Sequence, residues 1–362
     1  MDNKSFNIDK CREIIDSVDH QIVELLDLRA QQARLIGRAK AEQGLKYYDP
    51  GRQRRVLQKV IKSGGKTFPP TALKVVFTEI MSACLALERR IRIGYFGSEA
   101  TFTHQAAMDE FGQSAEYISY PDIPSLFVAV EKDRVDYSVV PIENSTGGVV
   151  HRTLDMFLDF DVKICNEIML PVSMNLLSNC PMSQIKKIYS HPQGFLQTQV
   201  WLARNLPNIA QIEVATTVQG IQHALDEKNA AAIASEMAAQ FYKIKILRKG
   251  IEDSKDNITR FWVLSHQMAE PSGNDKTSLM FSIKDKKGAL HKILEPISRR
   301  GLNLTKIESR PSKRKAWEYV FFCDVACHIS SRKLQNALKQ IEPLCIFLKV
   351  LGSYPSEIKM RS

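Results

Sequence analysis

The sequence predicts a multidomain protein: an all-α segment, a two-lobed α/β body and a ferredoxin-like α+β domain. Three observations carry this prediction. Residues 7–43 keep a helical apolar period without a proline, short β-rich runs alternate with helical stretches over 93–266, and a β-α-β-β-α-β order follows the polar linker 268–276. A chain of 362 residues is long enough for two or three domains. We place them at 1–92, 93–267 and 277–355.

The first helix is predicted to need a partner chain. Its apolar residues recur at three- and four-residue steps. They are Ile8, Cys11, Ile15, Val18, Ile22, Leu25, Ala33 and Ile36. Such a helix is roughly 55 Å long, too long to bury its apolar stripe within a monomer of this segment's size, so we expect a dimer. Gly44 ends the helix, and two more helices are expected at about 50–63 and 70–90, separated by "SGGKTFPP".

The middle segment reads as alternating strands and helices. Strand-like runs include "RIGYFG", "AEYISY", "DYSVVPIE", "KKIYSH", "IEVATT" and "AAAIAS", and helical patterns follow them, the first at 103–111, 124–132 and 147–159. This alternation favours a mainly parallel sheet. The length suggests two lobes with a cleft between them, where a small ligand would bind.

The C-terminal segment completes the prediction. Strands are expected at 277–284, 302–310, 317–327 and 345–352, and helices at 288–300 and 331–342. That order is the ferredoxin-like arrangement.

Composition and charge exclude several classes of protein. The net charge is +10, but no stretch interleaves basic and aromatic residues, so small anionic substrates explain the charge as well as a nucleic acid would. No apolar run approaches 18 residues, and the N-terminus lacks the apolar region of a signal peptide, so neither membrane insertion nor export is expected. Seven cysteines without framework spacing favour reduced thiols and a cytoplasmic location. Cys323, Cys327 and His328 lack a second pair for zinc, and no metal site is predicted.

Arg12, Arg29 and Lys40 are among the basic residues of the first helix. Arg29 and Lys40 are eleven residues apart and fall on nearly the same face, whereas Arg12 lies on another face about 25 Å away. Only an antiparallel partner helix could bring its own Arg12 to the other two. Such a site suits a dicarboxylate, since arginine binds carboxylates bidentately. The alternative is a solvated basic face.

The segment "CREIIDSVDHQIVELLDLRAQQARLIGRAK" resembles the helical chorismate mutases in its R-x16-R-x10-K pattern. It is most similar to the mutase half of the bifunctional chorismate mutase–prephenate dehydratase family, the P-proteins of phenylalanine biosynthesis. The resemblance implies an interleaved dimer in which Arg12 crosses to the partner's site, and these chorismate contacts: Arg12, Arg29, Lys40, Asp49, Arg52, Gln53, Cys84 and Glu88. Lys40 and Glu88 would stabilise charge on the ether oxygen of a pericyclic transition state.

Three of these positions depart from the family pattern. Gln53 stands where the family often has Glu, Cys84 where Ser may occur, and Glu88 where Gln may donate to the ether oxygen. Glu88 can donate only when protonated. These departures bear on the mutase rate and its pH optimum.

Four stretches in order resemble the dehydratase family. They are "GYFGSEATFTHQAA", "VPIENSTGG", "YSHPQGFLQTQVWL" and "DNITRF". The resemblance implies a fold like that of periplasmic binding proteins and names Thr259 as proton donor to the leaving hydroxyl, with no metal or cofactor. Arg260 would hold a substrate carboxylate. Further prephenate contacts would be Thr101, Asn144, Ser145, Ser190, Gln193 and Phe261. Taken singly, these residues also fit helix caps and strand ends.

Two C-terminal stretches, "KDKKGALHKILEPI" and "LTKIESRPSK", resemble the ACT domain attached to dehydratases. That resemblance implies a phenylalanine site for feedback inhibition at a dimer interface. Its residues would be Gly288, Ala289, Leu290, Glu308, Ser309, Arg310 and Pro311. Without it, the same residues fit a generic turn and an edge strand.

The sequence therefore predicts a cytoplasmic, allosteric, bifunctional enzyme, an isomerase and lyase that makes phenylpyruvate from chorismate through prephenate and works as a homodimer or a tetramer. Two alternatives stay open. One is a dehydratase with a weakened mutase, because of Gln53 and Glu88. The other is a phenylalanine-binding regulator without catalysis, which would be indifferent to Thr259→Ala.

Overall fold

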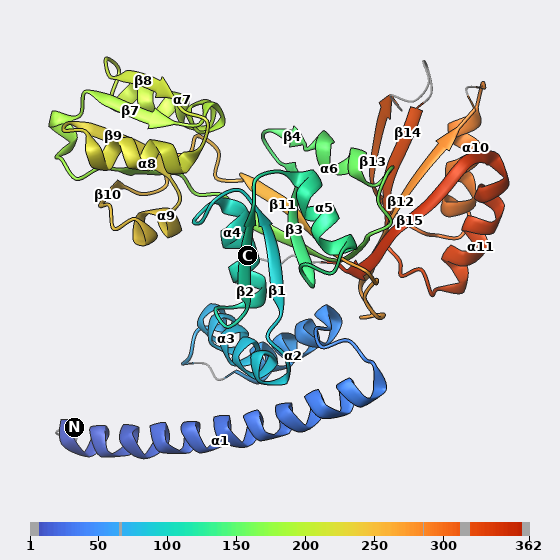
Figure 1. The fold of residues 1–362 in the computed structure, drawn as a ribbon, viewed down its shortest axis with the longest axis horizontal. Helices are drawn as coiled ribbons and strands as arrows, with labels where there is room; N and C mark the ends of the chain where they lie inside the picture. The colour runs from blue at the N-terminus through green and yellow to red at the C-terminus, as the bar shows by residue number, and fades with distance from the viewer. Residues whose placement is uncertain (1–6, 65–66, 285, 312–318, 357–362) are drawn as a thin grey trace, which may run out of the picture. The chain divides into compact units, whose positions relative to one another are not determined.

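The computed structural model describes residues 7–64, 67–284, 286–311 and 319–356 (Figure 1). The chain forms two compact units. One holds the residues up to Asp49 together with Val56–Ile91 and Phe111–Glu116, and the other holds the rest of the described chain. The short segment Phe111–Glu116 joins the first unit because the backbone amides of Gln113 and Ser114 donate to the side chains of Glu79 and Ser82.

The first unit is helical, as predicted. Its helices are α1 (Ile8–Gln43), α3 (Pro70–Glu88) and the larger part of α2 (Pro50–Ser63). Asn7 caps α1 by accepting from the amides of Asp9 and Lys10, and Gly44 ends it in the left-handed region at φ 63°.

Most of the apolar surface of α1 is exposed. The helix packs against α3 but buries only Ala33 and Gly37. Large apolar side chains remain exposed along its length: Ile8, Ile14, Ile15, Val18, Ile22, Val23, Leu25, Leu26, Leu28, Leu35 and Ile36. Exposure on this scale is what the helical period led us to expect of a helix that needs a partner chain.

One helix bears on the expectation that the chain has no transmembrane segment. α3 is long and apolar enough to cross a membrane by length and hydropathy, with a mean hydropathy of 1.4 in its best window. Lys74 and Glu79 interrupt it, so it is not the continuous apolar run that we found to be absent from the sequence. A single helix of this kind is weak evidence, because helices of water-soluble proteins also pass the test.

The second unit begins with a sheet of strand order β2-β1-β3-β11-β5, in which β4 also pairs with β3. Its strands are β1 (Arg92–Phe96), β2 (Glu116–Tyr120), β3 (Tyr137–Asn144), β4 (Gly148–Val149), β5 (Lys163–Pro171) and β11 (Ile258–Ser265). Its helices are α4 (Phe102–Phe111), α5 (Ile123–Glu131) and α6 (His151–Met156).

A second sheet forms the other lobe, in the order β10-β6-β9-β7-β8. Its strands are β6 (Asn175–Leu177), β7 (Lys187–Ser190), β8 (Ala210–Glu213), β9 (Ala230–Ala234) and β10 (Ile246–Arg248). Its helices are the short 3-10 turn Met182–Gln184, α7 (Pro192–Asn205), α8 (Thr217–Asp226) and α9 (Glu236–Phe241).

Both sheets are mixed, which corrects the expectation of a mainly parallel sheet. The pairs β1–β3, β7–β8 and β7–β9 are parallel, but β11 runs antiparallel to β3 and β5 on either side of it. The chain leaves the first lobe after β5, builds the second lobe and returns as β11. This return inserts β11 between two strands formed earlier.

The last sheet has the ferredoxin-like order β13-β14-β12-β15, as predicted. Its elements are β12 (Asp275–Ile283), α10 (Ala289–Ser298), β13 (Leu304–Pro311), β14 (Tyr319–Val325), α11 (Arg332–Ile341), the 3-10 turn Glu342–Leu344 and β15 (Cys345–Pro355). Helices α10 and α11 cover one face (Figure 1), where Leu279, Phe281 and Val325 join the helices' apolar residues in one core.

The other face of this sheet packs on the first lobe. Met280, Phe322 and Leu351 belong to the same apolar core as Ile164 and Trp262 of the lobe. The contact is closest at Gly352, where an added Cβ would overlap the carbonyl oxygen of Ile164 and lie 2.8 Å from its carbonyl carbon. The sheet and the lobe therefore share one core.

We expect Gly352→Ala to lower the free energy of unfolding by about 3 kcal/mol, because the new methyl group meets rigid backbone. Denaturant unfolding of the full chain measures this. Ile346→Ala on the exposed part of the same strand is the matched control and should change stability little. Equal effects from the two variants would contradict the close packing at Gly352.

Candidate active sites

A cavity of about 170 Å³ lies where residues of the two lobes meet. Its lining comes from both: Phe102, Asn144, Val172, Met174, Ser190, His191, Gln193, Gly194, Gln197, Thr217, Ile233 and Thr259. The predicted cleft is therefore present, and four of the predicted prephenate-site residues line it: Asn144, Ser190, Gln193 and Thr259.

Thr259 is oriented in this cavity by Asn144. The Asn144 Nδ2 donates to Thr259 Oγ1 at 2.8 Å, and also to Asn257 Oδ1 at 2.8 Å. The Asn144 Oδ1 accepts from Thr146 N, Thr146 Oγ1 and Gly147 N at 3.0, 2.6 and 2.8 Å. Three donors fix the amide's orientation, so its NH₂ group faces Thr259. A hydroxyl that accepts this bond keeps its own proton to donate.

The cavity is polarised toward an anion although its lining has no Arg or Lys. Ser190 to Gly194 lie at the N-terminus of α7, and Thr217 begins α8. Helix N-termini carry partial positive charge, which favours carboxylates. At α7 the amides of Gln193 and Gly194 are already bound by His191, so only the partial charge acts there. Ser190 Oγ and Gln197 Oε1 are buried, and no partner within the described chain satisfies them. A ligand in the cavity could supply both partners.

Gln197 and His191 line the cavity but were absent from the predicted site. Gln197 Nε2 donates to Thr146 Oγ1 at 3.0 Å, and His191 caps α7 through its ring nitrogen. The sequence held a signal for Gln197, since it follows Gln193 by four residues and therefore shares its helix face.

Three further predicted residues lie outside the cavity lining. Thr101 accepts from the amide of His104 at the start of α4, and Phe261 is buried in the protein. Ser145 joins two segments, because its hydroxyl donates to Asp256 O and accepts from Ile258 N. Of the three, Ser145 is the one whose hydrogen bonds link β3 to the start of β11.

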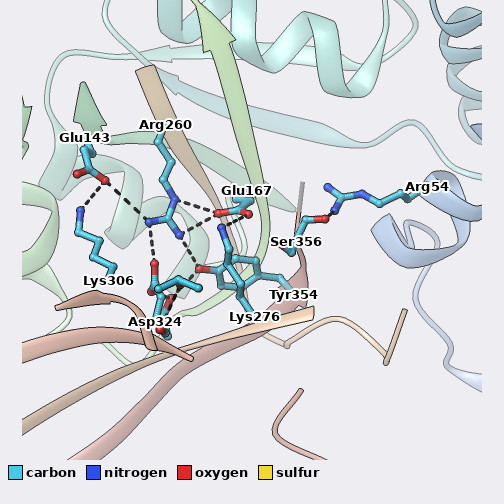
Figure 2. Close-up of polar contacts among 11 residues, drawn as sticks. Arg54, Glu143, Glu167, Arg260, Lys276, Lys306, Asp324, Tyr354 and Ser356 are labelled. Carbon is cyan, nitrogen blue, oxygen red and sulfur yellow. Dashed lines mark hydrogen bonds and ion pairs between the residues drawn. The ribbon is translucent and has the colours of Figure 1, made fainter. Parts of the chain in front are cut away.

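Arg260 is not among the residues that line the cavity, and its side chain contacts residues of the C-terminal sheet (Figure 2). Its guanidinium contacts Glu167 Oε2 at 2.8 Å, Asp324 Oδ2 at 2.7 Å and Tyr354 Oη at 3.0 Å. Burial by itself lowers the pKa of Arg260, but the charges of these three groups outweigh it and raise the pKa. The structure therefore places the Arg260 charge in a buried ion cluster and not at the substrate cavity.

The predicted mutase residues of the first unit meet between α1 and α3. Lys40 Nζ donates to Glu88 Oε2 at 2.7 Å and to Tyr47 O at 2.8 Å, and Arg29 reaches Ile80 O at 3.5 Å. Cys84 is buried one turn before Glu88. An added Cβ at Gly37 would lie 2.9 Å from Glu88 Cα, so this glycine lets the helices approach closely.

The remaining predicted chorismate contacts are Arg12, Asp49, Arg52 and Gln53. Arg12 is exposed and pairs with Asp9 at 3.4 Å, while Asp49 lies at the end of the segment before α2. Arg52 and Gln53 belong to the second unit, where Gln53 Nε2 donates to Glu110 O at 2.8 Å.

The predicted phenylalanine-site residues lie in two places. Gly288 adopts φ 75° and caps α10, with Ala289 and Leu290 beginning the helix. Glu308, Ser309 and Pro311 lie on β13, and Arg310 of that strand pairs with Asp155 Oδ1 of α6 at 2.6 Å. Part of the connection after β13, residues 312–318, lies outside the described chain. Within the described ranges, no three His, Cys, Asp or Glu side chains gather as metal ligands would.

Family models match the chain in three consecutive segments. They are chorismate mutase type II over residues 11–89, prephenate dehydratase over 93–269 and the ACT domain over 277–343. The bifunctional chorismate mutase/prephenate dehydratase of Aquifex aeolicus is 46% identical over 96% of this chain and 97% of its own length. The prephenate dehydratase of Bacillus subtilis is 34% identical over 74% of this chain and 99% of its own.

The fold agrees with these matches. A solved prephenate dehydratase from Arthrobacter aurescens, crystallised with L-Phe, superposes with a TM-score of 0.70 at 29% identity and covers 75% of this chain and 92% of that one. The helical segment, the two-lobed body with its polar cavity and the ferredoxin-like sheet thus occur together and in the family's order. The chain belongs to the family of bifunctional chorismate mutase/prephenate dehydratases that carry an ACT domain.

Proposed function

We propose that this chain rearranges chorismate to prephenate at the α1–α3 site and converts prephenate to phenylpyruvate in the two-lobed cavity. We assign these activities to residues 1–92 and 93–267, and a regulatory role to 277–355. The observation that carries the proposal is the Thr259 hydroxyl, which faces a polar cavity with its lone pair bound by Asn144.

Thr259 would act as the proton donor of the dehydratase. The ring carboxylate leaves as carbon dioxide, and the electron pair of its bond enters the ring. The ring hydroxyl leaves with the Thr259 proton as water, and a proton from solvent restores the threonine. Hydroxide is a poor leaving group, so this proton is the catalytic requirement. The helix N-termini at Ser190–Gly194 and at Thr217 would hold the substrate's carboxylates.

Lys40 would stabilise charge on the breaking ether bond in the mutase. The reaction is an intramolecular rearrangement, so holding the reactive conformer and stabilising that charge are sufficient. Arg29 would bind a carboxylate of chorismate. In this structure Glu88 accepts from Lys40 and orients it. An ionised Glu88 cannot donate to the ether oxygen.

That pairing favours a second candidate, a full dehydratase with a weakened mutase. The two candidates differ in the rate of prephenate formation from chorismate. A large gain in that rate for Gln53→Glu would favour the weakened mutase.

We further propose a cytoplasmic dimer in which the α1 helices of the two chains cover each other's apolar faces. The exposed apolar face of α1 supports the dimer. The seven cysteines, all free thiols, support the cytoplasmic location. Arg12 would then reach the partner's site.

Complementation tests the crossing of Arg12. Arg12→Ala and Arg29→Ala chains should each lose most mutase activity, because each lacks one arginine at every site. A mixed dimer holds one site with both arginines, so mixing the two unfolded variants and refolding them should restore activity. If Arg12 served its own chain's site, mixing would restore nothing.

Phenylalanine would act as feedback inhibitor at Gly288–Leu290 and Glu308–Pro311. The main test of the whole proposal follows phenylpyruvate from chorismate with purified wild-type protein, with and without phenylalanine. We expect product formation without added metal or cofactor, and less of it when phenylalanine is present. No product from either chorismate or prephenate would overturn the proposal.

A further inference from the structure

Thr259 and Arg260 are neighbours on β11 but serve opposite faces of the sheet. Successive side chains of a strand point to opposite sides. Thr259 therefore lines the cavity, and Arg260 enters the interface with the ACT domain. One peptide joins the proposed proton donor to a buried charge.

The cluster around Arg260 is shared by both domains (Figure 2). Glu167 of β5 accepts from Arg260 and, at 2.7 Å, from Lys276 of β12. From the ACT side, Asp324 of β14 accepts from Arg260 at 2.7 Å and from Ser278 at 2.5 Å.

Three more groups complete the cluster. Tyr354 of β15 accepts from Arg260 at 3.0 Å, and Lys306 pairs with Glu143 at 2.5 Å. Glu143 of β3 also lies 4.0 Å from the Arg260 guanidinium. Three cations thus meet three carboxylates, so the charges balance, with Arg260, Glu167 and Asp324 buried and the other three partly exposed.

The backbone ladder of β11 is regular on one side of this stretch only, where its pairing with β5 runs without a shift from Ile258 to Val263. Its pairing with β3 shifts register between Arg260 and Phe261. Such irregularities interrupt the ladder and re-aim side chains next to active sites. At the interruption, the side chain of Arg260 is bound by groups from β5, β14 and β15. The cluster adds a side-chain restraint where the pairing with β3 is irregular.

We propose that Arg260 is a positioning residue for Thr259, and that Asp324 and Tyr354 make the ACT domain a structural component of the dehydratase site. The proposal rests on the proton-donor role given to Thr259. It also reassigns Arg260, for which the family resemblance implies direct contact with a substrate carboxylate.

The test compares Asp324→Asn, Tyr354→Phe and Arg260→Lys in the full chain. Displacing a reacting group by about 1 Å can cost on the order of a hundredfold in rate. We expect Asp324→Asn to lower dehydratase kcat tenfold or more with the KM for prephenate unchanged. Tyr354→Phe should lower it less, and Arg260→Lys should keep part of the activity.

Two controls separate positioning from damage. Mutase activity of the same chain should stay at the wild-type level, which reports an intact first unit, and the thermal unfolding of the full chain reports folding of the second. Asp155→Asn removes the partner of Arg310, another ion pair between the same two domains but away from β11, and should change kcat less than twofold.

A double-mutant cycle decides the mechanism. If Asp324 acts through Thr259, adding Asp324→Asn to Thr259→Ala lowers the residual rate no further. Multiplied effects would show general damage to the domain and overturn the proposal. A raised KM with unchanged kcat in Arg260→Lys would also overturn it, in favour of direct substrate binding.

Two results distinguish the positioning role of Arg260 from the proton-donor role of Thr259. An inactive Thr259→Ala beside a fully active Asp324→Asn would refute positioning alone. A fully active Thr259→Ala would refute the proton-donor role itself.

Discussion

Thr259→Ala is expected to remove dehydratase activity while leaving the mutase intact. Proton donation by a positioned group contributes about 10²- to 10⁴-fold to a rate, so turnover of purified prephenate should fall by that factor. The substrate should still bind, because Ser190, Gln193 and the helix N-termini remain. The measurement is phenylpyruvate formation at saturating prephenate, with prephenate formation from chorismate followed in the same preparation.

Thr259→Ser is the matched control for this result. Serine keeps the hydroxyl that Asn144 contacts and should retain much of the activity, whereas Thr259→Val keeps the shape without the hydroxyl and should match alanine. Unchanged turnover in the alanine variant would contradict the mechanism, whatever the identity of the surrounding residues.

Arg260 shows which features of a site a sequence motif can predict and which it cannot. Thr259-Arg260-Phe261 was interpreted as one substrate-binding cluster. The alternation of strand side chains already implied that two neighbours could not both face the cavity. That rule needed only the strand assignment, which "RFWV" supported. The identity of the partners did not follow, because Glu167, Asp324 and Tyr354 are brought together by packing between domains.

Local patterns predicted elements better than they predicted pairings. The first helix, from Ile8 to Gln43, and the order of the last sheet followed from periodicity and from the order of elements. The antiparallel insertion of β11 did not follow, since it depends on a chain that leaves one lobe and returns about 90 residues later. The expected helix at 147–159 is also shorter, because Gly148–Val149 pairs with β3 before α6 begins.

For the cavity too, local sequence patterns predicted residues, whereas contacts between distant segments could not be predicted. Asn144, Ser190 and Thr259 were expected from their motifs, and Gln197 could have been added from its helix spacing. The hydrogen bond from Asn144 to Thr259 joins residues 115 positions apart in the sequence. It leaves the hydroxyl proton of Thr259 available for donation. The helix and strand periodicities relate residues only a few positions apart, so they could not predict this bond.

Lys40→Met is expected to remove mutase activity and to spare the dehydratase. Removing one preorganised donor from a developing oxyanion costs about 10²- to 10³-fold in kcat, and Lys40 is the cation held at this site by Glu88 and Tyr47 O. Prephenate formation from chorismate measures the loss, and phenylpyruvate formation from added prephenate serves as the internal control.

The substitution also leaves the Glu88 carboxylate without its cation, so lost stability must be separated from lost chemistry. Lys40→Met with Glu88→Gln removes that unpaired charge, and thermal unfolding should show recovered stability without recovered activity. Arg38→Met, at an exposed position on the same helix, should retain activity. Recovery of the mutase in the double variant would show that Lys40 serves only to neutralise Glu88, and another residue would then have to stabilise the ether oxygen.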